Sequence, residues 1–168
     1  GRHNAFAAAG IESVVQRRHL EAAPTLPLID PALVDEMIDI HLAAPDRYDL
    51  ITNRHPLTFP DGLDVDVMSL GSLTTAWTNA TTHEQREHTI PYFWQAGLRV
   101  LNVTSHENLF HTHRWTLDYP EDYSLIKSIF ESLYENNPGF GTAAILDLLA
   151  DRPELSAINA RYLPVAAV

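Results

Sequence analysis

The chain has 168 residues, 45% of them hydrophobic and 20% charged, so it is long enough to bury one sizeable core. Its 22 acidic residues outnumber the 11 basic ones, and the formal charge of −11 argues against a general nucleic-acid or membrane surface, since both attract net positive charge. The lack of cysteine excludes disulfides, and no apolar run reaches the roughly 18 residues of a membrane span. We therefore expect one soluble, cytoplasmic domain.

The first predicted elements lie at the beginning of the chain. Residues 2–9 look like the last turns of a helix closed by Gly10, and the apolar run 11–15 predicts a strand. Surface exposure explains the basic run 17–19 most simply, with phosphate binding as the alternative. Because the chain begins inside such an αβ unit, we expect it to be the later part of a longer polypeptide.

A helix is expected after Asp30-Pro31, because Asp is a good N-cap and Pro favours the first helical position. The residues expected to face the core repeat at helical spacing and are Leu33, Val34, Met37, Ile38, His41 and Leu42. Residues 48–52 predict a strand. Residues 63–70 predict a half-exposed strand, because apolar and acidic side chains alternate along most of it.

Helix signals dominate the rest of the chain. Capping boxes at Thr81-Thr82 predict a short helix, and residues 125–134 and 142–150 predict two covering helices. Short strands are expected at 100–103 and 114–117. Strands separated by helices indicate an α/β layered fold.

Asp118 is the first candidate site residue, because it lies between the expected strand 114–117 and the helix start at Pro120. A carboxylate at the carboxyl end of a strand can hold Mg²⁺ together with water and substrate phosphates. The alternative is a helix-start acid that interacts only with the helix dipole.

Two further groups of residues could bind a substrate. Asp64 and Asp66 would share one strand face after the turn at Asp61, where they could accept sugar hydroxyls or simply keep an edge strand soluble. Arg86 at a helix start could bind a carboxylate or phosphate, and His88 could donate to the same anion. A solvated helical face is the competing interpretation.

The histidines suggest a weaker hypothesis. His111 and His113 would point to the same side of an extended segment, and with His106 they raise the idea of a zinc site. No carboxylate at a diagnostic spacing accompanies them.

Four segments together resemble the cytidylyltransferase family of spore-coat polysaccharide biosynthesis proteins, which is related to the synthetases of CMP-activated acidic sugars. The segments are 27–31 (PLIDP), 60–66 (PDGLDVD), 86–92 (REHTIPY) and 114–122 (RWTLDYPED). They follow the family's order and spacing, and the resemblance runs from about residue 1 to Asn159.

The resemblance implies a three-layer α/β/α, Rossmann-like nucleotide-diphospho-sugar transferase fold. Residues 1–168 would be the C-terminal portion of a single domain that lacks its N-terminal part. The implied reaction transfers CMP from CTP to an acidic or other sugar, with release of pyrophosphate, for surface-polysaccharide or glycoconjugate synthesis. Relatives of this fold are often dimers, which leaves a homodimer open.

The resemblance also assigns roles to residues. Asp118 would be a Mg²⁺ ligand, and Arg86 and His88 would be the candidate catalytic residues. The substrate-binding candidates are Asp61, Asp64, Asp66, Arg86, Glu87 and Arg114.

Two family features have no counterpart in this sequence. One is a Gly-rich loop with Arg and Lys that holds the triphosphate. The other is a Gly-Asp pair before Pro27 whose Asp is the second metal ligand, where this chain has Thr25. One carboxylate cannot by itself neutralise a triphosphate and orient an in-line attack, so we expect this chain alone to be poorly active. A cytidylyltransferase, a degenerate binding or assembly subunit and a His-based metal hydrolase remain open, in that order.

Overall fold

The computed structural model describes residues 25–88 and 90–164, and these form two units. The first unit comprises residues 36–52, 66–88 and 90–103, and the second comprises residues 25–35, 53–65 and 104–164. The helix, strand and basic run expected within residues 2–19 lie outside the described residues. The expectation of a single domain stays a prediction.

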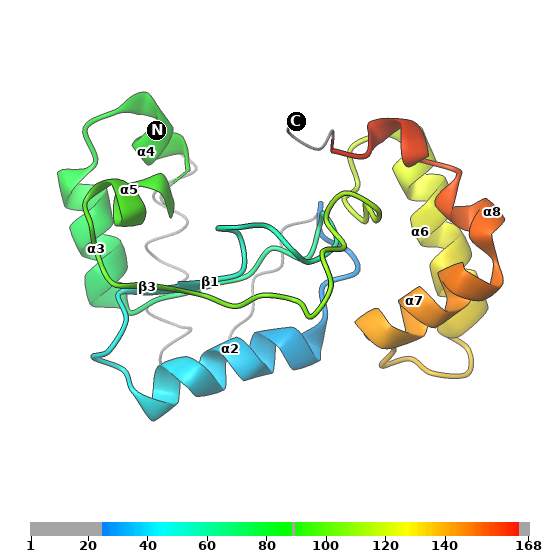
Figure 1. The fold of residues 1–168 in the computed structure, drawn as a ribbon, viewed down its shortest axis with the longest axis horizontal. Coiled ribbons are helices and arrows are strands. Elements are labelled where there is room, and N and C mark those ends of the chain that lie inside the picture. Colours follow the sequence, from blue (N-terminus) through cyan, green and yellow to red (C-terminus); the bar gives the residue numbers. More distant parts are fainter. Residues whose placement is uncertain (1–24, 89, 165–168) are drawn as a thin grey trace. The chain divides into compact units, whose positions relative to one another are not determined.

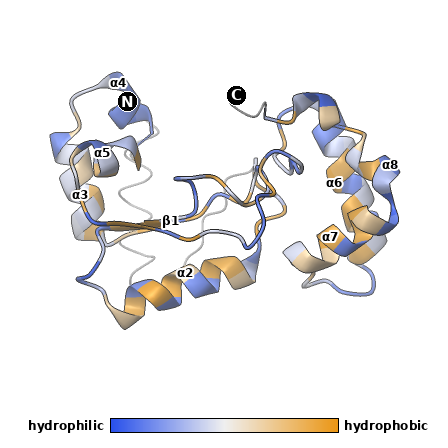
Figure 2. Cartoon of the chain, viewed as in Figure 1, coloured by the Kyte–Doolittle hydropathy of each residue, from blue (hydrophilic) through white to orange (hydrophobic). Residues whose placement is uncertain are grey.

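The first unit contains a small mixed sheet in the order β2-β1-β3. Figure 1 labels β1 and β3, which are paired in parallel. Its strands are β1 (Leu50–Thr52), β2 (Asp66–Val67) and β3 (Val100–Asn102). Ile51 of β1 lies opposite Val67 in an antiparallel pair and opposite Leu101 in a parallel pair. All of β1 is buried, and Figure 2 shows hydrophobic colouring along this strand.

Helices bury one face of this sheet. The first unit contains most of α2 (Pro31–Ala43) and all of α3 (Leu70–Asn79), α4 (His83–Glu87) and α5 (Ile90–Gln95). Leu50 of β1 forms a buried cluster with Ala76 of α3 and with Ile90 and Phe93 of α5. The apolar residues of these two short helices therefore form the core above the central strand.

The sequence prediction for α2 is largely confirmed. The helix begins at Pro31, and Leu33, Val34 and Met37 are buried. Leu42 in the last turn differs, because 62% of its surface is exposed. Hydrophobic and hydrophilic residues alternate along α2 in Figure 2, as expected for a helix with one covered face.

The second unit is mainly helical. It contains α6 (Pro120–Leu133), α7 (Thr142–Asp151), α8 (Pro153–Ser156) and the short 3₁₀ helix η1 (Ala160–Tyr162). The three α-helices lie against one another (Figure 1). Their fully or nearly fully buried apolar residues are Leu125, Ile126, Ile129, Ile145, Leu149 and Leu155. The helices predicted at 125–134 and 142–150 are thus confirmed, whereas their role as covering helices stays a prediction.

Two predicted strands are wrong in extent. Of residues 63–70 only Asp66 and Val67 form a strand. Before them, the side chain of Asn53 donates to Leu63 O at 2.6 Å and accepts from Val65 N at 2.9 Å, so it satisfies backbone groups that a neighbouring strand would otherwise pair. After them, Ser69 is the N-cap of α3, so the chain is helical from Leu70 onward.

The second of these predicted strands, at residues 114–117, does not form at all. Arg114 makes a single parallel bridge with Asp61, and Leu117 N donates to Thr25 O at 3.0 Å. The segment is paired at these points without becoming part of a sheet. None of the helices within residues 25–88 and 90–164 is long and apolar enough to cross a membrane.

Candidate active site

Three predicted site residues lie together in the second unit. The guanidinium of Arg114 donates from Nη1 to Asp61 Oδ2 at 2.8 Å and from Nη2 to Asp118 Oδ2 at 2.6 Å. It also donates to both oxygens of Asp122, from Nε at 3.3 Å and from Nη2 at 3.2 Å. One cation therefore holds three carboxylates, and the group keeps an excess of negative charge.

A glycine turn brings Asp61 to this group. Asp61 N donates to His113 O at 3.0 Å, and Trp115 N donates to Asp61 O at 2.6 Å. Gly62 follows with φ of 109°, and a Cβ on it would lie 2.6 Å from Thr116 N. Only glycine combines this backbone conformation with so close an approach of two chain segments. The Asp-Gly pair of the sequence therefore sets the position of the Asp61 carboxylate.

Asp122 anchors the group from inside the fold. Its side chain is fully buried, and its Oδ2 accepts the backbone N–H groups of Asp118 at 3.1 Å and Tyr119 at 3.0 Å. Asn159 Nδ2 donates to its Oδ1 at 2.8 Å. Burial opposes the charged form, but the donors from Asn159, Arg114 and the two backbone groups bring the pKa of Asp122 below its ordinary value.

The Asp61 carboxyl behaves differently. Burial raises the pKa of Asp61 above its ordinary value, and the negative charges of Asp64 and Asp118 act in the same direction. The attraction of Arg114 does not offset them, because this guanidinium shares its charge among three acids. Asp61 therefore takes up a proton more readily than Asp122, whose pKa is lowered.

Asp118 is the accessible carboxylate of the group. Its side chain is 48% exposed, and among the described residues only Arg114 binds it, through Oδ2. It directly precedes the Tyr119 N-cap of α6, so the predicted helix start is confirmed while the preceding strand is not. Leu117, which directly precedes Asp118, bonds through its backbone to Thr25. Thr25 is the residue for which the family resemblance leads one to expect the second metal-binding Asp.

The donor set fits Mg²⁺ only in part. Mg²⁺ often uses one or two carboxylates and completes its shell with water and substrate phosphates. Asp118 can supply one carboxylate, whereas Thr25 can supply only a hydroxyl or carbonyl oxygen. Within residues 25–88 and 90–164 no group of three or more His, Cys, Asp or Glu side chains could hold a metal ion. A cation here would need further ligands beyond these two residues.

The other two acids of the 60–66 segment have separate partners. Arg54 Nε lies 3.1 Å from Asp64 Oδ2, and Thr52 Oγ1 donates to Asp66 Oδ1 at 2.6 Å. Asp64 belongs to the second unit, whereas Asp66 belongs to the first, in β2. Their predicted role in substrate binding stays a prediction.

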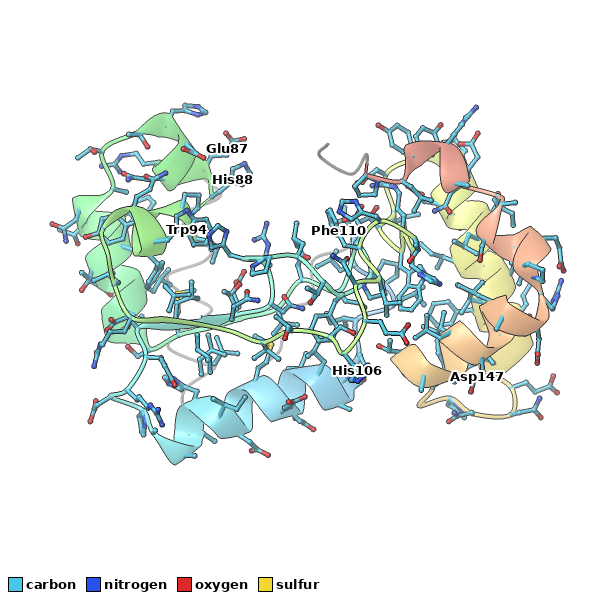
Figure 3. The ribbon with its side chains drawn as sticks, viewed as in Figure 1. Glu87, His88, Trp94, His106, Phe110 and Asp147 are labelled. Carbon is cyan, nitrogen blue, oxygen red and sulfur yellow. The ribbon has the colours of Figure 1, made fainter. Side chains whose placement is uncertain are left out.

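Arg86, Glu87 and His88 lie on or directly after α4 in the first unit, and all three are exposed. The side chains of Glu87 and His88 project from the end of the helix (Figure 3). Glu87 pairs with His83 at 3.3 Å, and the Arg86 guanidinium lies 5.8 Å from the Trp77 ring centroid. The predicted capping box is confirmed at Thr82, which explains why the helix begins here. The catalytic and binding roles stay predictions.

In the part of the chain that the structure describes, the histidines do not belong to any group of three or more His, Cys, Asp or Glu side chains that could hold a metal ion. His111 Nδ1 lies 3.1 Å from Pro164 O, and His113 Nδ1 lies 2.8 Å from Thr112 Oγ1. Burial lowers the pKa of His113, although a backbone hydrogen bond at Leu109 opposes this shift. The structure gives the hydrolase hypothesis no support.

Sequence reasoning missed the roles of two residues. Asp122 was not among the candidate site residues, and its burial cannot be inferred from its place two residues after Pro120. Asn159 lies 37 residues further along the chain, and no local signal connects it with Asp122. Both become visible only when the fold brings them to Arg114.

Comparison with solved structures finds similarity to a cytidylyltransferase from Leptospira borgpetersenii serovar Hardjo-bovis (strain JB197). The TM-score is 0.73 at 22% sequence identity, and the match covers 85% of this chain and 58% of that chain. The chain therefore matches over half of the length of the Leptospira protein. No model of a known protein family matches. A search of curated proteins finds no significant match.

At this level of identity the similarity establishes the fold. The mixed α/β fold of this chain, with its small sheet and its covering helices, is that of a cytidylyltransferase. This agrees with the resemblance found in the sequence, at the level of the fold class. The three-layer arrangement stays a prediction.

Proposed function

We propose that this chain acts in nucleotidyl transfer, in which CMP passes from CTP to a sugar and pyrophosphate is released. The fold shared with a cytidylyltransferase supports the reaction class. The observation that carries the proposal is Asp118, a half-exposed carboxylate at the start of α6, held in place by Arg114. A carboxylate in this position suits a nucleotide that arrives with a cation.

In this proposal Asp118 would provide a carboxylate ligand to Mg²⁺. When bound, Mg²⁺ neutralises the phosphate charge that develops during the transfer. A sugar hydroxyl oxygen would form the new bond to the α-phosphorus and lose its proton to solvent, while the bond from the α-phosphorus to the leaving pyrophosphate breaks. Carboxylates of the same unit, such as Asp61, would accept hydroxyls of the sugar.

The test is pyrophosphate release from CTP and acidic sugars by the full encoded polypeptide with Mg²⁺. Asp118→Asn should lower kcat by about a hundredfold or more, since mutating a residue that only hydrogen-bonds to a metal ligand typically lowers activity by about 10–100-fold. Asp147→Asn is the matched control, because Asp147 is exposed on α7 and the substitution removes the same charge (Figure 3). Full activity of the Asp118 variant would reject its role as a ligand.

A second candidate is a non-catalytic binding or assembly subunit of the same fold. Thr25 favours it, because this residue stands where the family resemblance expects the second metal-binding Asp. Under this alternative, CTP would bind to the wild-type protein without pyrophosphate release under any sugar tested. Calorimetric titration with CTP and Mg²⁺ beside the activity assay separates the two.

A further inference from the structure

Asn159 hydrogen-bonds to two residues of the candidate site. It is only 2% exposed and directly precedes η1. Its Nδ2 donates to Asp122 Oδ1 at 2.8 Å and to Arg114 O at 2.9 Å. An amide nitrogen carries two hydrogens, so these two bonds use its full donor capacity.

Asp122 is held equally firmly. Its two oxygens together accept the Arg114 guanidinium, the Asn159 amide and the backbone N–H groups of Asp118 and Tyr119. A buried carboxylate with donors on both oxygens cannot rotate without losing several of them. It therefore presents a fixed pair of acceptors to Arg114.

The orientation of the Arg114 guanidinium follows from this arrangement. Nε and Nη2 face Asp122, which leaves Nη1 for Asp61, while Nη2 also reaches Asp118. Because the guanidinium is planar and rigid, fixing one edge fixes the directions of all its N–H groups. The buried pair thus sets where the two outer carboxylates are held.

We propose that Asp122 and Asn159 are positioning residues for Asp118. Asn159 keeps Asp122 in place, Asp122 orients Arg114, and Arg114 together with the Asp122 contact to Asp118 N holds the Asp118 carboxylate for the reaction. This inference rests on the proposed function, since it takes Asp118 to be the group that meets the nucleotide.

The experiment compares Asn159→Leu with Asn53→Leu in the full polypeptide. Asn53 is a matched control, because it is 1% exposed, lies in the same unit and bonds two backbone groups, neither of which belongs to Arg114 or Asp122. Asp122→Asn is the second variant, since it keeps the size of the side chain while removing its charge. Thermal melts identify any variant that does not fold.

The first readout is independent of activity. The Nε–H signal of Arg114, assigned by its loss in Arg114→Lys, is followed by ¹⁵N NMR. We expect its exchange with water to be about tenfold faster in Asn159→Leu and Asp122→Asn, and unchanged in Asn53→Leu. Unchanged exchange in both test variants would overturn the proposal, whatever their activity.

The second readout is catalytic. We expect kcat to fall about tenfold in Asn159→Leu with little change in the KM for CTP, because Asp118 is misplaced rather than removed. Faster exchange of the Arg114 Nε–H together with a wild-type kcat would overturn the positioning role. If wild-type protein transfers no CMP, the proposed function fails, whereas the NMR comparison still decides whether Asn159 and Asp122 orient Arg114.

Discussion

The guanidinium of Arg114 lies among the carboxylates of Asp61, Asp118 and Asp122, and only 11% of its side chain is exposed. Removing a partner from such a buried group is costly, because the remaining charges lose their compensation. Asp118 drew attention in the sequence as a metal ligand. The structure shows that its carboxylate forms an ion pair with Arg114, four residues earlier in the chain.

Gly62 allows a direct prediction at the residue scale. Gly62→Ala should destabilise the second unit, because its backbone has φ of 109° and the new Cβ would meet the backbone of Trp115 and Thr116. The backbone conformation alone should cost about 1–3 kcal/mol, and the clash should add to this. Urea unfolding measures the change.

The control for this prediction is Gly97→Ala. Gly97 also has positive φ, at 68°, but a Cβ there has no neighbour within 4 Å. The difference between the two variants isolates the contribution of the close approach. Equal destabilisation of both would contradict the argument.

At the scale of elements, Asp30 serves two helices at once. Its Oδ1 accepts from Ala32 N at 2.9 Å in α2, and its Oδ2 accepts from Thr142 N at 2.8 Å in α7. Gly141 leaves room for this carboxylate, since a Cβ there would lie 2.9 Å from Asp30 Oδ2. One side chain therefore satisfies the first turns of helices more than a hundred residues apart in sequence.

Asp30→Ala should consequently weaken both helix starts. Each lost cap costs typically about 1 kcal/mol, so the variant should lose more stability than a variant with a single lost cap. Ser69→Ala is the comparison, because Ser69 caps only α3, through Ser72 N at 3.0 Å. Amide hydrogen exchange should show faster exchange in the first turns of both α2 and α7. Protection that persists in α7 would contradict the double cap.

The helices with local start signals could be predicted from sequence. So could the strands expected at 48–52 and 100–103, which correspond to β1 and β3, whereas those expected at 63–70 and 114–117 were wrong in part or in full. Asp30, Thr82 and Pro120 mark α2, α4 and α6, because capping depends on neighbouring residues only. The strand predicted from the alternation in residues 63–70 failed because Asn53, ten residues before Leu63, pairs that backbone. The sequence analysis also overlooked α3, whose Ser and Thr content weakens helix propensity although Ser69 was a usable cap signal.

The same distinction applies to the candidate site. Asp61, Arg114 and Asp118 were named from sequence, and the structure brings them together. Asp122 and Asn159 were not named, because their role depends on burial and on a contact across 37 residues. Buried side chains that only orient site residues have no characteristic spacing in the sequence by which they could be recognised.

For the whole molecule, stability should depend on acid pH through carboxylates that accept hydrogen bonds in the folded chain. The pKa values of Asp30, Asp49 and Asp122 lie below the ordinary value of 3.8, in each case because hydrogen bonds outweigh the opposing effect of burial. The unfolded chain therefore takes up protons at higher pH than the folded chain. This contribution is present above about pH 3.8 and is lost as the pH falls towards the folded pKa values.

Asp61 acts in the opposite direction. Its pKa is raised in the folded protein, so its contribution is present at low pH and is lost as the pH rises through the folded pKa. Urea midpoints between pH 6 and about pH 2.5 should therefore fall on acidification in the wild-type protein and fall less in Asp122→Asn. A variant with the same pH dependence as the wild type would show that Asp122 contributes nothing to it.

The contacts of Arg114 also have a consequence for motion. They join the turn at Asp61, the loop at Asp118 and the segment at Asn159, either directly or through Asp122. Opening any one of these segments breaks contacts on which the others depend, so they share one opening free energy. Three distant stretches of sequence are thereby coupled into a single cooperative unit, and the candidate site is either fully assembled or lost as a whole.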